Sequence, residues 1–186
     1  MNLYCITLFL SDEKIREILS LCEKKHLACK KSVASDQTNA KIGSFQIECG
    51  GLRILLLPSN DFHKDDDFEI GLTTATKPEW ETLIANLKAN FAVEYEKFPD
   101  GETEYCIFKD EKSHGNFFFI FDGEKSKSAC LEKIECAVSE YDFDFYNEKI
   151  AKIIGKNLSD KICVQKGEKS FVKRLILKND EKIILF

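Results

Sequence analysis

The alternation of apolar and polar positions predicts a strand, a helix and three more strands in the first third of the chain. Leu3–Leu10 is rich in strand-forming residues and is followed by Ser11 and Asp12, either of which is suited to cap a helix. Four apolar residues then recur at the spacing of one helix face: Ile15, Ile18, Leu19 and Cys22. The following apolar runs read as strands separated by polar or glycine turns: Cys29–Ala34, Lys41–Cys49 and Leu52–Leu57. The pattern predicts a β-α-β-β-β unit.

The same order of elements returns after a polar and acidic stretch, Asn60–Asp67. Phe68–Thr74 is the next predicted strand, and Thr76 and Pro78 are typical of the start of a helix. The apolar face of this helix consists of Trp80, Leu83, Ile84 and Leu87. The remaining strands are predicted at Ala92–Phe98, Thr103–Lys109 and Asn116–Phe121.

The apolar positions of the two halves coincide when one half is shifted onto the other. A shift of 64 positions places Ile6 on Ile70 and Leu8 on Leu72, and a shift of 65 places Ile15 on Trp80. Identity between the halves is near nil, so it is the order of elements and the apolar register that repeat. We predict an α+β fold with tandem β-α-β-β-β modules at residues 3–59 and 67–123, together forming a domain over residues 1–125.

Residues 126–186 do not repeat this pattern and predict a C-terminal α/β extension, a helix plus a β-hairpin. Helices are predicted at Lys127–Glu140 and Lys149–Ile154, and strands at Ile162–Gln165, Phe171–Leu177 and Lys182–Phe186. Between them, residues 141–146 alternate aromatic and acidic side chains, which favours a half-buried connection over a partner-binding stripe. A small sheet requires one buried face, so we expect packing against the rest of the chain, with an exposed edge that suits a protein partner. Packing against a second copy, as a homodimer, is the alternative.

Composition narrows the classes of function. The chain has 186 residues, is 44% hydrophobic and carries a net charge of -5, so neither nucleic acid nor an anionic membrane is an expected partner. No apolar run reaches the ~18 residues of a membrane span, and the N-terminus lacks the basic start of a secretory signal. The eight cysteines form no C-x-x-C pair, which favours buried thiols in a reducing cytoplasm.

Tandem β-α-β-β-β units resemble the vicinal oxygen chelate superfamily, which includes glyoxalase, the bleomycin- and fosfomycin-resistance proteins, methylmalonyl-CoA epimerase and extradiol dioxygenases. The run from Gly50 to Arg53 before the closing strand of the first unit matches the style of that family. Lys109 and Asp110, followed by Gly115 and Asn116, resemble the turn of its second module. The resemblance implies that the two sheets curl around a shared cavity, which is the default ligand site.

The resemblance also implies four metal ligands, on the first and last strand of each module. Carrying this pattern over strand by strand leads to Cys5, Leu55, Glu69 and Phe119. Leucine and phenylalanine cannot bind a metal, and a cysteine with one glutamate makes no plausible site for the metals of this family. We therefore expect a member without metal, cofactor or catalytic residues, comparable to the bleomycin-resistance type.

The predicted role is binding of an apolar or aromatic small molecule, or of a protein partner, at the cleft between the modules. The candidate ligand-binding residues are Cys5, Glu69, Tyr105, Phe117 and Phe119. Two other classes stay open: a protein-interaction module of toxin-immunity or adaptor type with a filled cleft, and a lyase or isomerase that uses Cys5 and Glu69. The acidic stretch around His63 reads as a solvated linker rather than as a site for a divalent ion.

Overall fold

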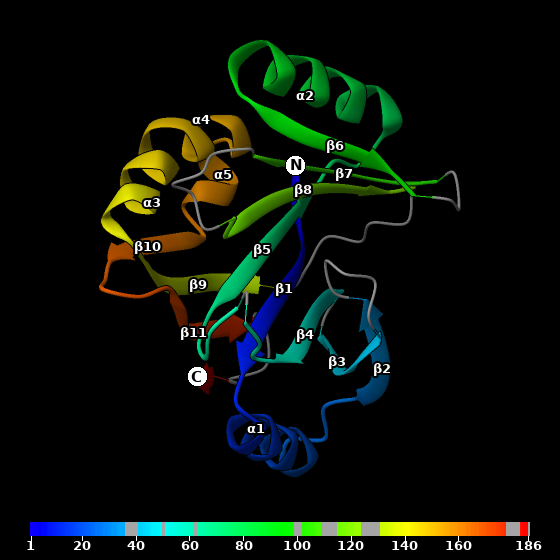
Figure 1. Ribbon diagram of the computed structural model, residues 1–186, viewed down its shortest axis with the longest axis vertical. Helices are drawn as coiled ribbons and strands as arrows, with labels where there is room; N and C mark the ends of the chain where they lie inside the picture. Colours follow the sequence, from blue (N-terminus) through cyan, green and yellow to red (C-terminus); the bar gives the residue numbers. More distant parts are fainter. Residues whose placement is uncertain are drawn as a thin grey trace.

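The computed structural model describes residues 1–35, 41–49, 51–61, 63–98, 102–108, 115–123, 131–177 and 183–185. These residues form an eight-stranded sheet with the order β2-β3-β4-β1-β5-β8-β7-β6 and a four-stranded sheet with the order β10-β9-β11-β12 (Figure 1). Together with the helices they make an α+β fold, which confirms the predicted fold class. Within the described ranges, no helix is long and apolar enough to cross a membrane.

The first half of the large sheet follows the predicted order of elements. It consists of β1 (Asn2–Leu10), α1 (Asp12–Lys24), β2 (Cys29–Ser35), β3 (Lys41–Cys49) and β4 (Leu52–Pro58). Of the two predicted caps, Ser11 is the one that caps α1, by accepting a hydrogen bond from the backbone N–H of Lys14. The last strand, β4, returns beside β1 and pairs with it in parallel, while β2, β3 and β4 are joined as antiparallel neighbours.

The second half has the same strand order. Its elements are β5 (Phe68–Thr73), α2 (Lys77–Asn90), β6 (Val93–Lys97), β7 (Thr103–Phe108) and β8 (Phe117–Asp122). Here β8 pairs in parallel with β5, and Thr76 forms a capping box with Glu79 at the start of α2. The antiparallel pairing of β1 with β5 joins the halves edge to edge in the middle of the sheet.

A buried carboxylate fastens α2 to the sheet. Glu104 on β7 is 3% exposed and accepts hydrogen bonds from Trp80 Nε1 at 2.6 Å and from the Tyr95 hydroxyl at 2.8 Å, and it also pairs with Lys77. Burial alone would raise the pKa of Glu104, but the hydrogen bonds from Lys77, Tyr95 and Trp80 outweigh it and lower the pKa to about 2.

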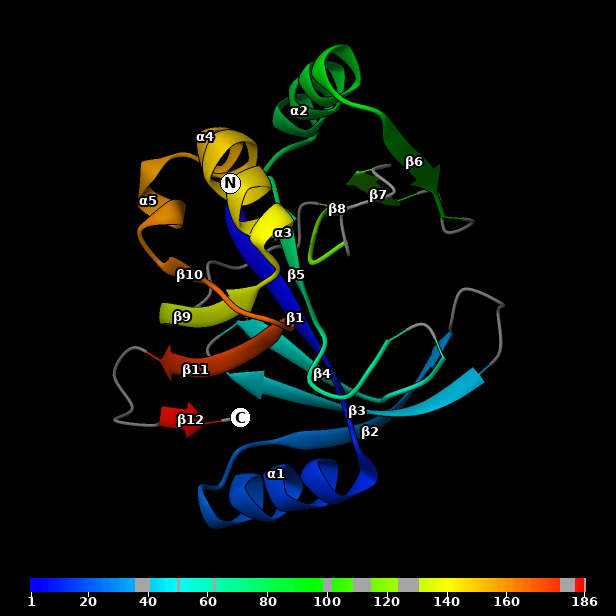
Figure 2. The ribbon, with the colours of Figure 1, turned by 60° about the vertical axis from the view of Figure 1, so that its left-hand side comes forward.

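The two faces of the large sheet differ. Figure 2 shows α1, α2 and the smaller sheet on the outer side of a curved sheet, while the inner side carries no helix. We call this inner side the helix-free face. Along β8 the side chains alternate between the buried Phe117, Phe119 and Phe121 and the half-buried Phe118 and Ile120. The half-buried set belongs to the helix-free face.

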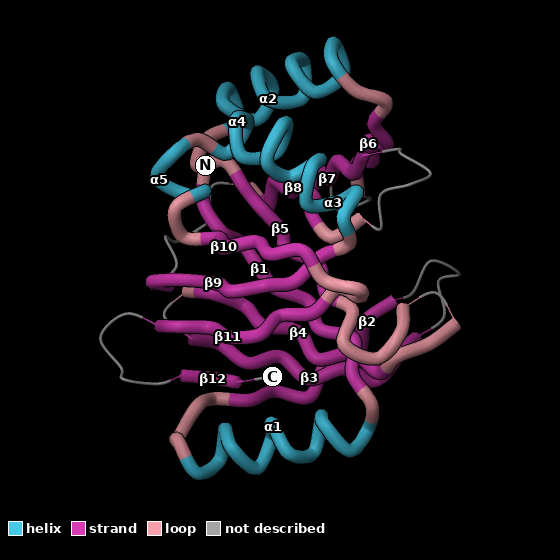
Figure 3. Tube along the Cα trace, turned by 90° about the vertical axis from the view of Figure 1, so that its left-hand side faces the viewer, coloured by secondary structure: helices cyan, strands magenta, loops and turns pink. Residues whose placement is uncertain are grey.

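The C-terminal part packs between α1 and α2 on the outer side (Figure 3). It consists of β9 (Leu131–Val138), α3 (Glu140–Phe145), a π-helical turn (Tyr146–Ile150), α4 (Ala151–Ile154), α5 (Lys156–Ser159), β10 (Ile162–Lys166), β11 (Phe171–Leu177) and β12 (Ile183–Leu185). The ring of Phe145 meets that of Phe108 at 5.1 Å, and Tyr146 meets Phe117 at 5.1 Å. These contacts pack the helical turns of the C-terminal part onto the large sheet, and the buried residues of both sheets form one core.

The helix predicted at Lys127–Glu140 is wrong, because its described part from Leu131 to Val138 is the strand β9; residues 127–130 lie outside the described residues. The apolar residues there fit two periods. Ile134 and Val138 suit a helix face, but together with Cys136 they also alternate as in a strand, and all three are 0% exposed. The strand period prevails because β9 lies between β10 and β11, which satisfy its backbone on both sides. The predicted helix-plus-hairpin is therefore a four-stranded sheet in which helical turns connect β9 to β10.

Candidate ligand-binding site

Two of the predicted site residues, Cys5 and Glu69, meet at the junction of the two halves. Cys5 on β1 pairs with Gly71 on β5, and Thr7 pairs with Glu69. Cys5 and Glu69 are therefore diagonal neighbours on one face of the sheet. This is the helix-free face, because the residues that alternate with them, such as Ile70, are fully buried on the outer side.

The aromatic residues of β8 are placed differently from the prediction. Phe119 is 0% exposed, and its ring contacts Phe108 edge-on at 5.8 Å within the outer core. Phe117 belongs to the same core, while the half-buried Phe118 lies in the row of Gly71 on the helix-free face. The phenylalanines predicted from the sequence thus lie on the opposite side of the sheet from Glu69, and Phe118 is the residue that shares its face.

Gly71 allows Phe118 to lie against Cys5. A Cβ atom at residue 71 would be 2.7 Å from Cys5 Sγ and 2.7 Å from Phe118 Cζ, which is closer than such atoms approach one another. The ring of Phe118 therefore lies over the glycine, next to the thiol. Leu55 and Ile120 are half-buried on the same face, so apolar side chains surround the junction on this face.

Tyr105 on β7 completes the predicted set. It pairs with Ile120 and is half-buried on the helix-free face. Burial and the hydrogen bond to Glu96 raise the pKa of its phenol to about 12, so it is neutral and donates its O–H to Glu96. Its ring lies 5.5 Å from that of Phe98.

Glu69 is the unusual group of this face. Burial, and secondly the negative charge of Asp67, raise the pKa of its carboxyl to about 7. No hydrogen bond or ion pair joins its side chain to any residue that the structure describes. Burial and the nearby Glu69 in turn raise the pKa of Cys5 to about 12, so Cys5 is a neutral thiol and a poor nucleophile.

A polar cluster beside this site links the two halves and was missed by the sequence analysis. The Arg53 guanidinium donates to Asp122 Oδ2 at 3.1 Å and lies 4.1 Å from the centre of the Tyr4 ring. The Tyr4 hydroxyl donates to the same oxygen of Asp122 at 2.7 Å, and Thr103 donates to its other oxygen at 3.3 Å. Residues so distant along the chain meet only because the sheet curves, which no local pattern in the sequence signals.

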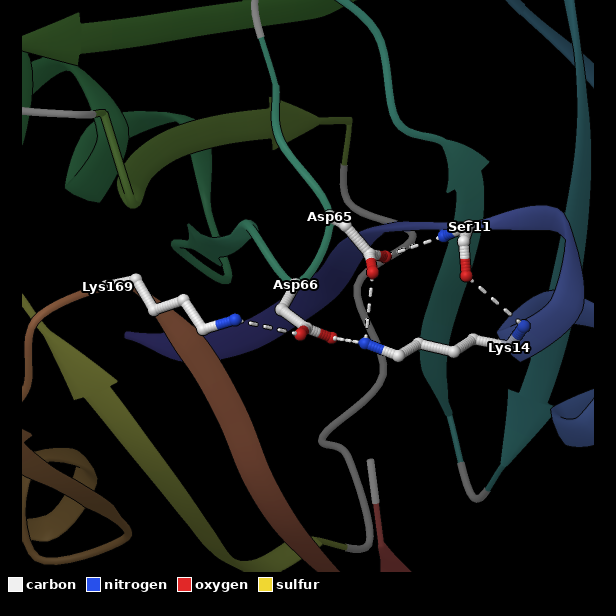
Figure 4. A network of polar contacts seen from close by, with 5 residues as sticks. All are labelled: Ser11, Lys14, Asp65, Asp66 and Lys169. Carbon is white, nitrogen blue, oxygen red and sulfur yellow. Dashed lines mark hydrogen bonds and ion pairs between the residues drawn. The ribbon is translucent and has the colours of Figure 1, made fainter.

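The acidic linker between β4 and β5 is fastened in place rather than solvated along its length. Figure 4 shows Asp65 accepting from the backbone N–H of Ser11 at 2.7 Å and from Lys14 Nζ at 3.1 Å. Asp66 accepts from Lys14 at 2.6 Å and pairs with Lys169 of the C-terminal part at 3.5 Å. The linker thereby connects α1 to the loop before β11 and fixes the start of the strand that carries Glu69.

His63 of the linker also has a defined place. Its ring stacks on Phe9 of β1 with 3.8 Å between the ring centres. Burial lowers the pKa of His63, against the weaker effect of Asp67, so the imidazole is predominantly neutral at pH 7.

The residues of the junction do not fit the metal site that the family resemblance implies. Hard cations and zinc need several carboxylate or imidazole ligands, and Glu69 is the one such group among Cys5, Thr7, Leu55, Glu69 and Phe118. Over the described parts of the chain, no group of three or more His, Cys, Asp or Glu residues is placed to hold a metal ion. We derive no chemistry through a metal.

A groove of about 610 Å³ lies along α1, on the other side of the sheet. It is lined by Leu10, Lys14, Arg16, Glu17, Ile18, Ser20, Leu21 and Lys24. Its charged lining consists of three basic residues and one acidic residue, and Lys14 is already paired with the linker aspartates.

No model of a known protein family and no curated protein matches the sequence. Several solved structures match the chain at low sequence identity. One is a fusion of a xylose isomerase-like TIM barrel with 4-hydroxyphenylpyruvate dioxygenase, at 15% identity over 68% of this chain and 26% of that chain (TM-score 0.41). A hypothetical protein from Bacillus halodurans matches at 14% identity over 68% of this chain and 96% of its own (TM-score 0.40). A variant of 4-hydroxymandelate synthase from Streptomyces coelicolor matches at 9% identity over 98% of this chain and 61% of its own (TM-score 0.45). The chain thus spans about a quarter of the first of these proteins.

Proposed function

We propose that this chain binds a small molecule with an apolar or aromatic body on the helix-free face, at the junction of its two halves. The observation that carries the proposal is the half-buried carboxyl of Glu69, which lies on the same face as Phe118 and forms no hydrogen bond or ion pair with the described residues. Partial burial of a carboxyl in apolar surroundings opposes folding, and a ligand group that forms a hydrogen bond with it would offset that cost. Perturbed carboxyls in apolar surroundings are characteristic of functional sites.

The surroundings of Glu69 suit such a ligand. Phe118, Leu55 and Tyr105 offer half-buried apolar and aromatic surface on the same face. An apolar surface with a small number of placed polar groups is the usual composition of a small-molecule site. The neutral thiol of Cys5 supports binding without a covalent step.

Proton transfer is the second candidate, and the pKa of Glu69 favours it. A carboxyl with a pKa of about 7 is suited to act as a general acid or base near neutral pH. In that case a bound ligand would exchange a carbon-bound proton with deuterium from the solvent, and Glu69→Gln would stop the exchange. A ligand that binds without exchange supports binding alone.

The test is saturation-transfer NMR with a panel of small aromatic compounds. The unmodified protein should transfer saturation to some of these compounds, and Phe118→Leu should weaken the signal because it removes the aromatic ring at the junction. Glu132→Gln is the matched control, since Glu132 is exposed on β9 of the other sheet. Equal signals from Phe118→Leu and the unmodified protein would contradict the proposed site. Binding of a protein partner through residues 126–186, and homodimer formation, stay predictions.

A further inference from the structure

We propose that the ligand of this site carries a protonated amine, and that its ammonium group pairs with the carboxylate of Glu69 while its apolar body lies along Phe118. This inference rests on the proposed function and adds the charge class of the ligand. It follows from the distribution of charge around the junction and from the placement of the Phe118 ring.

In the described part of the chain, the cationic groups near the junction already have anionic partners. Arg53 is held by Asp122, and Lys14 and Lys169 are held by the linker aspartates. None of these cations contacts Glu69, and the imidazole of His63 is driven toward its neutral form by burial.

Among the residues that the structure describes, the groups that face Glu69 add negative charge or none. Asp67, two residues before it on the linker, is the charged neighbour that acts on Glu69, and Cys5 of β1 is a neutral thiol. On the second half, Tyr105 of β7 is a neutral phenol, and Asp122 of β8 is paired with Arg53. A cation brought to Glu69 would therefore meet net attraction, whereas an anion would meet two carboxylates.

The chemistry of an ammonium group matches what Glu69 lacks. It has three donors, and a charge-assisted hydrogen bond to a carboxylate is about twice as strong as a neutral one. The face of Phe118, which lies across Gly71 next to Cys5, adds an aromatic surface of the kind that attracts cations.

Pairing with an ammonium group requires the ionised form of Glu69, which gives the proposal a measurable consequence. With a pKa of about 7, the ionised fraction of Glu69 rises about tenfold between about pH 6 and about pH 8. A primary alkyl ammonium stays protonated over this range, so its affinity should rise by up to about tenfold. Binding should also release a proton near pH 7.

The experiment compares three probes of nearly the same shape: benzylammonium, benzyl alcohol and benzoate. Their affinities are measured by protein-observed NMR titration at about pH 6 and about pH 8, with the unmodified protein, Glu69→Gln and the control Glu132→Gln. Benzylammonium should bind most tightly, more tightly at the higher pH, and should lose both its preference and its pH dependence in Glu69→Gln alone.

The outcomes separate the two proposals. Benzyl alcohol or benzoate binding as tightly as benzylammonium, or benzylammonium binding unchanged in Glu69→Gln, would overturn the inference and leave the proposed function standing. If none of the three probes binds at any pH while another aromatic compound transfers saturation, the inference fails alone; if no aromatic compound transfers saturation either, the proposed function fails with it.

Discussion

Replacing Glu69 by glutamine should make the protein more stable at neutral and alkaline pH. The native pKa of Glu69 is raised from 4.5 to about 7, so between these values the native state holds more protons than the unfolded state. Under that condition the free energy of unfolding falls as pH rises, and the loss is complete above the native pKa. Glutamine has nearly the same shape but no charge, so it removes this term.

The magnitude follows from the size of the shift. A rise from 4.5 to about 7 corresponds to about 3 kcal/mol at most, since one pKa unit is about 1.4 kcal/mol. Below about pH 4.5 the two proteins should be equally stable apart from a constant offset, and above about pH 7 Glu69→Gln should gain up to about 3 kcal/mol relative to that offset.

Urea denaturation at closely spaced pH values measures this difference directly. Other titrating groups contribute equally to both proteins, so the difference between the two curves isolates Glu69. Glu132→Gln, which changes an exposed carboxylate, should run nearly parallel to the unmodified protein. If the curve of Glu69→Gln also runs parallel across the whole range, Glu69 is ordinarily solvated and the reasoning about the site is refuted.

Three other predictions concern stability and reactivity. Glu104→Gln should destabilise the protein by about 3 kcal/mol at neutral pH, because the pKa of Glu104 is lowered to about 2 in the native state. In the unmodified protein the stability that Glu104 contributes is present above about pH 4.5 and is lost as pH falls toward 2, and acid denaturation measures this loss. Gly71→Ala should lower the free energy of unfolding, measured in urea, by about 1–3 kcal/mol, because the added Cβ overpacks the junction. Gly43→Ala is the control, since no atom lies within 4 Å of its added Cβ, and equal effects of the two substitutions would contradict the close contact of Gly71 with Cys5 and Phe118. Among the described cysteines, Cys29 is the exposed one and should react first with a thiol reagent, and prior labelling of a buried thiol in the native protein would be the contrary result.

The sequence was most informative where one local rule decides the structure. The helix caps at Ser11 and Thr76 were predicted and are confirmed, because capping depends on residues within a single turn. The strand predicted at Leu3–Leu10 is β1 at Asn2–Leu10, since a clear helix-start signal follows it directly. The helix predicted at Lys127–Glu140 failed where the apolar residues fit both periods and tertiary pairing made the choice.

The site was predicted only in part, for reasons that lie beyond local pattern. Alternation along β8 shows that Phe118 faces away from Phe117 and Phe119, but the side that faces the helices is set by tertiary packing. Cys5 and Glu69 could be placed on one face because both belong to the central pair of strands. The contact between Arg53 and Asp122 depends on the curvature of the sheet, which the sequence does not express locally.

The central claim is that a small molecule binds on the helix-free face next to Glu69, and methyl NMR tests it most directly. Leu55 of β4 and Ile120 of β8 are half-buried on that face. Leu56 of β4 and Ile70 of β5 are 0% exposed on the outer side of the sheet. Titration with benzylammonium, or with any aromatic compound that transfers saturation, should shift the methyl signals of Leu55 and Ile120 and leave those of Leu56 and Ile70 nearly unchanged. Shifts confined to the outer side or to the groove along α1, with Leu55 and Ile120 unmoved, would contradict the account.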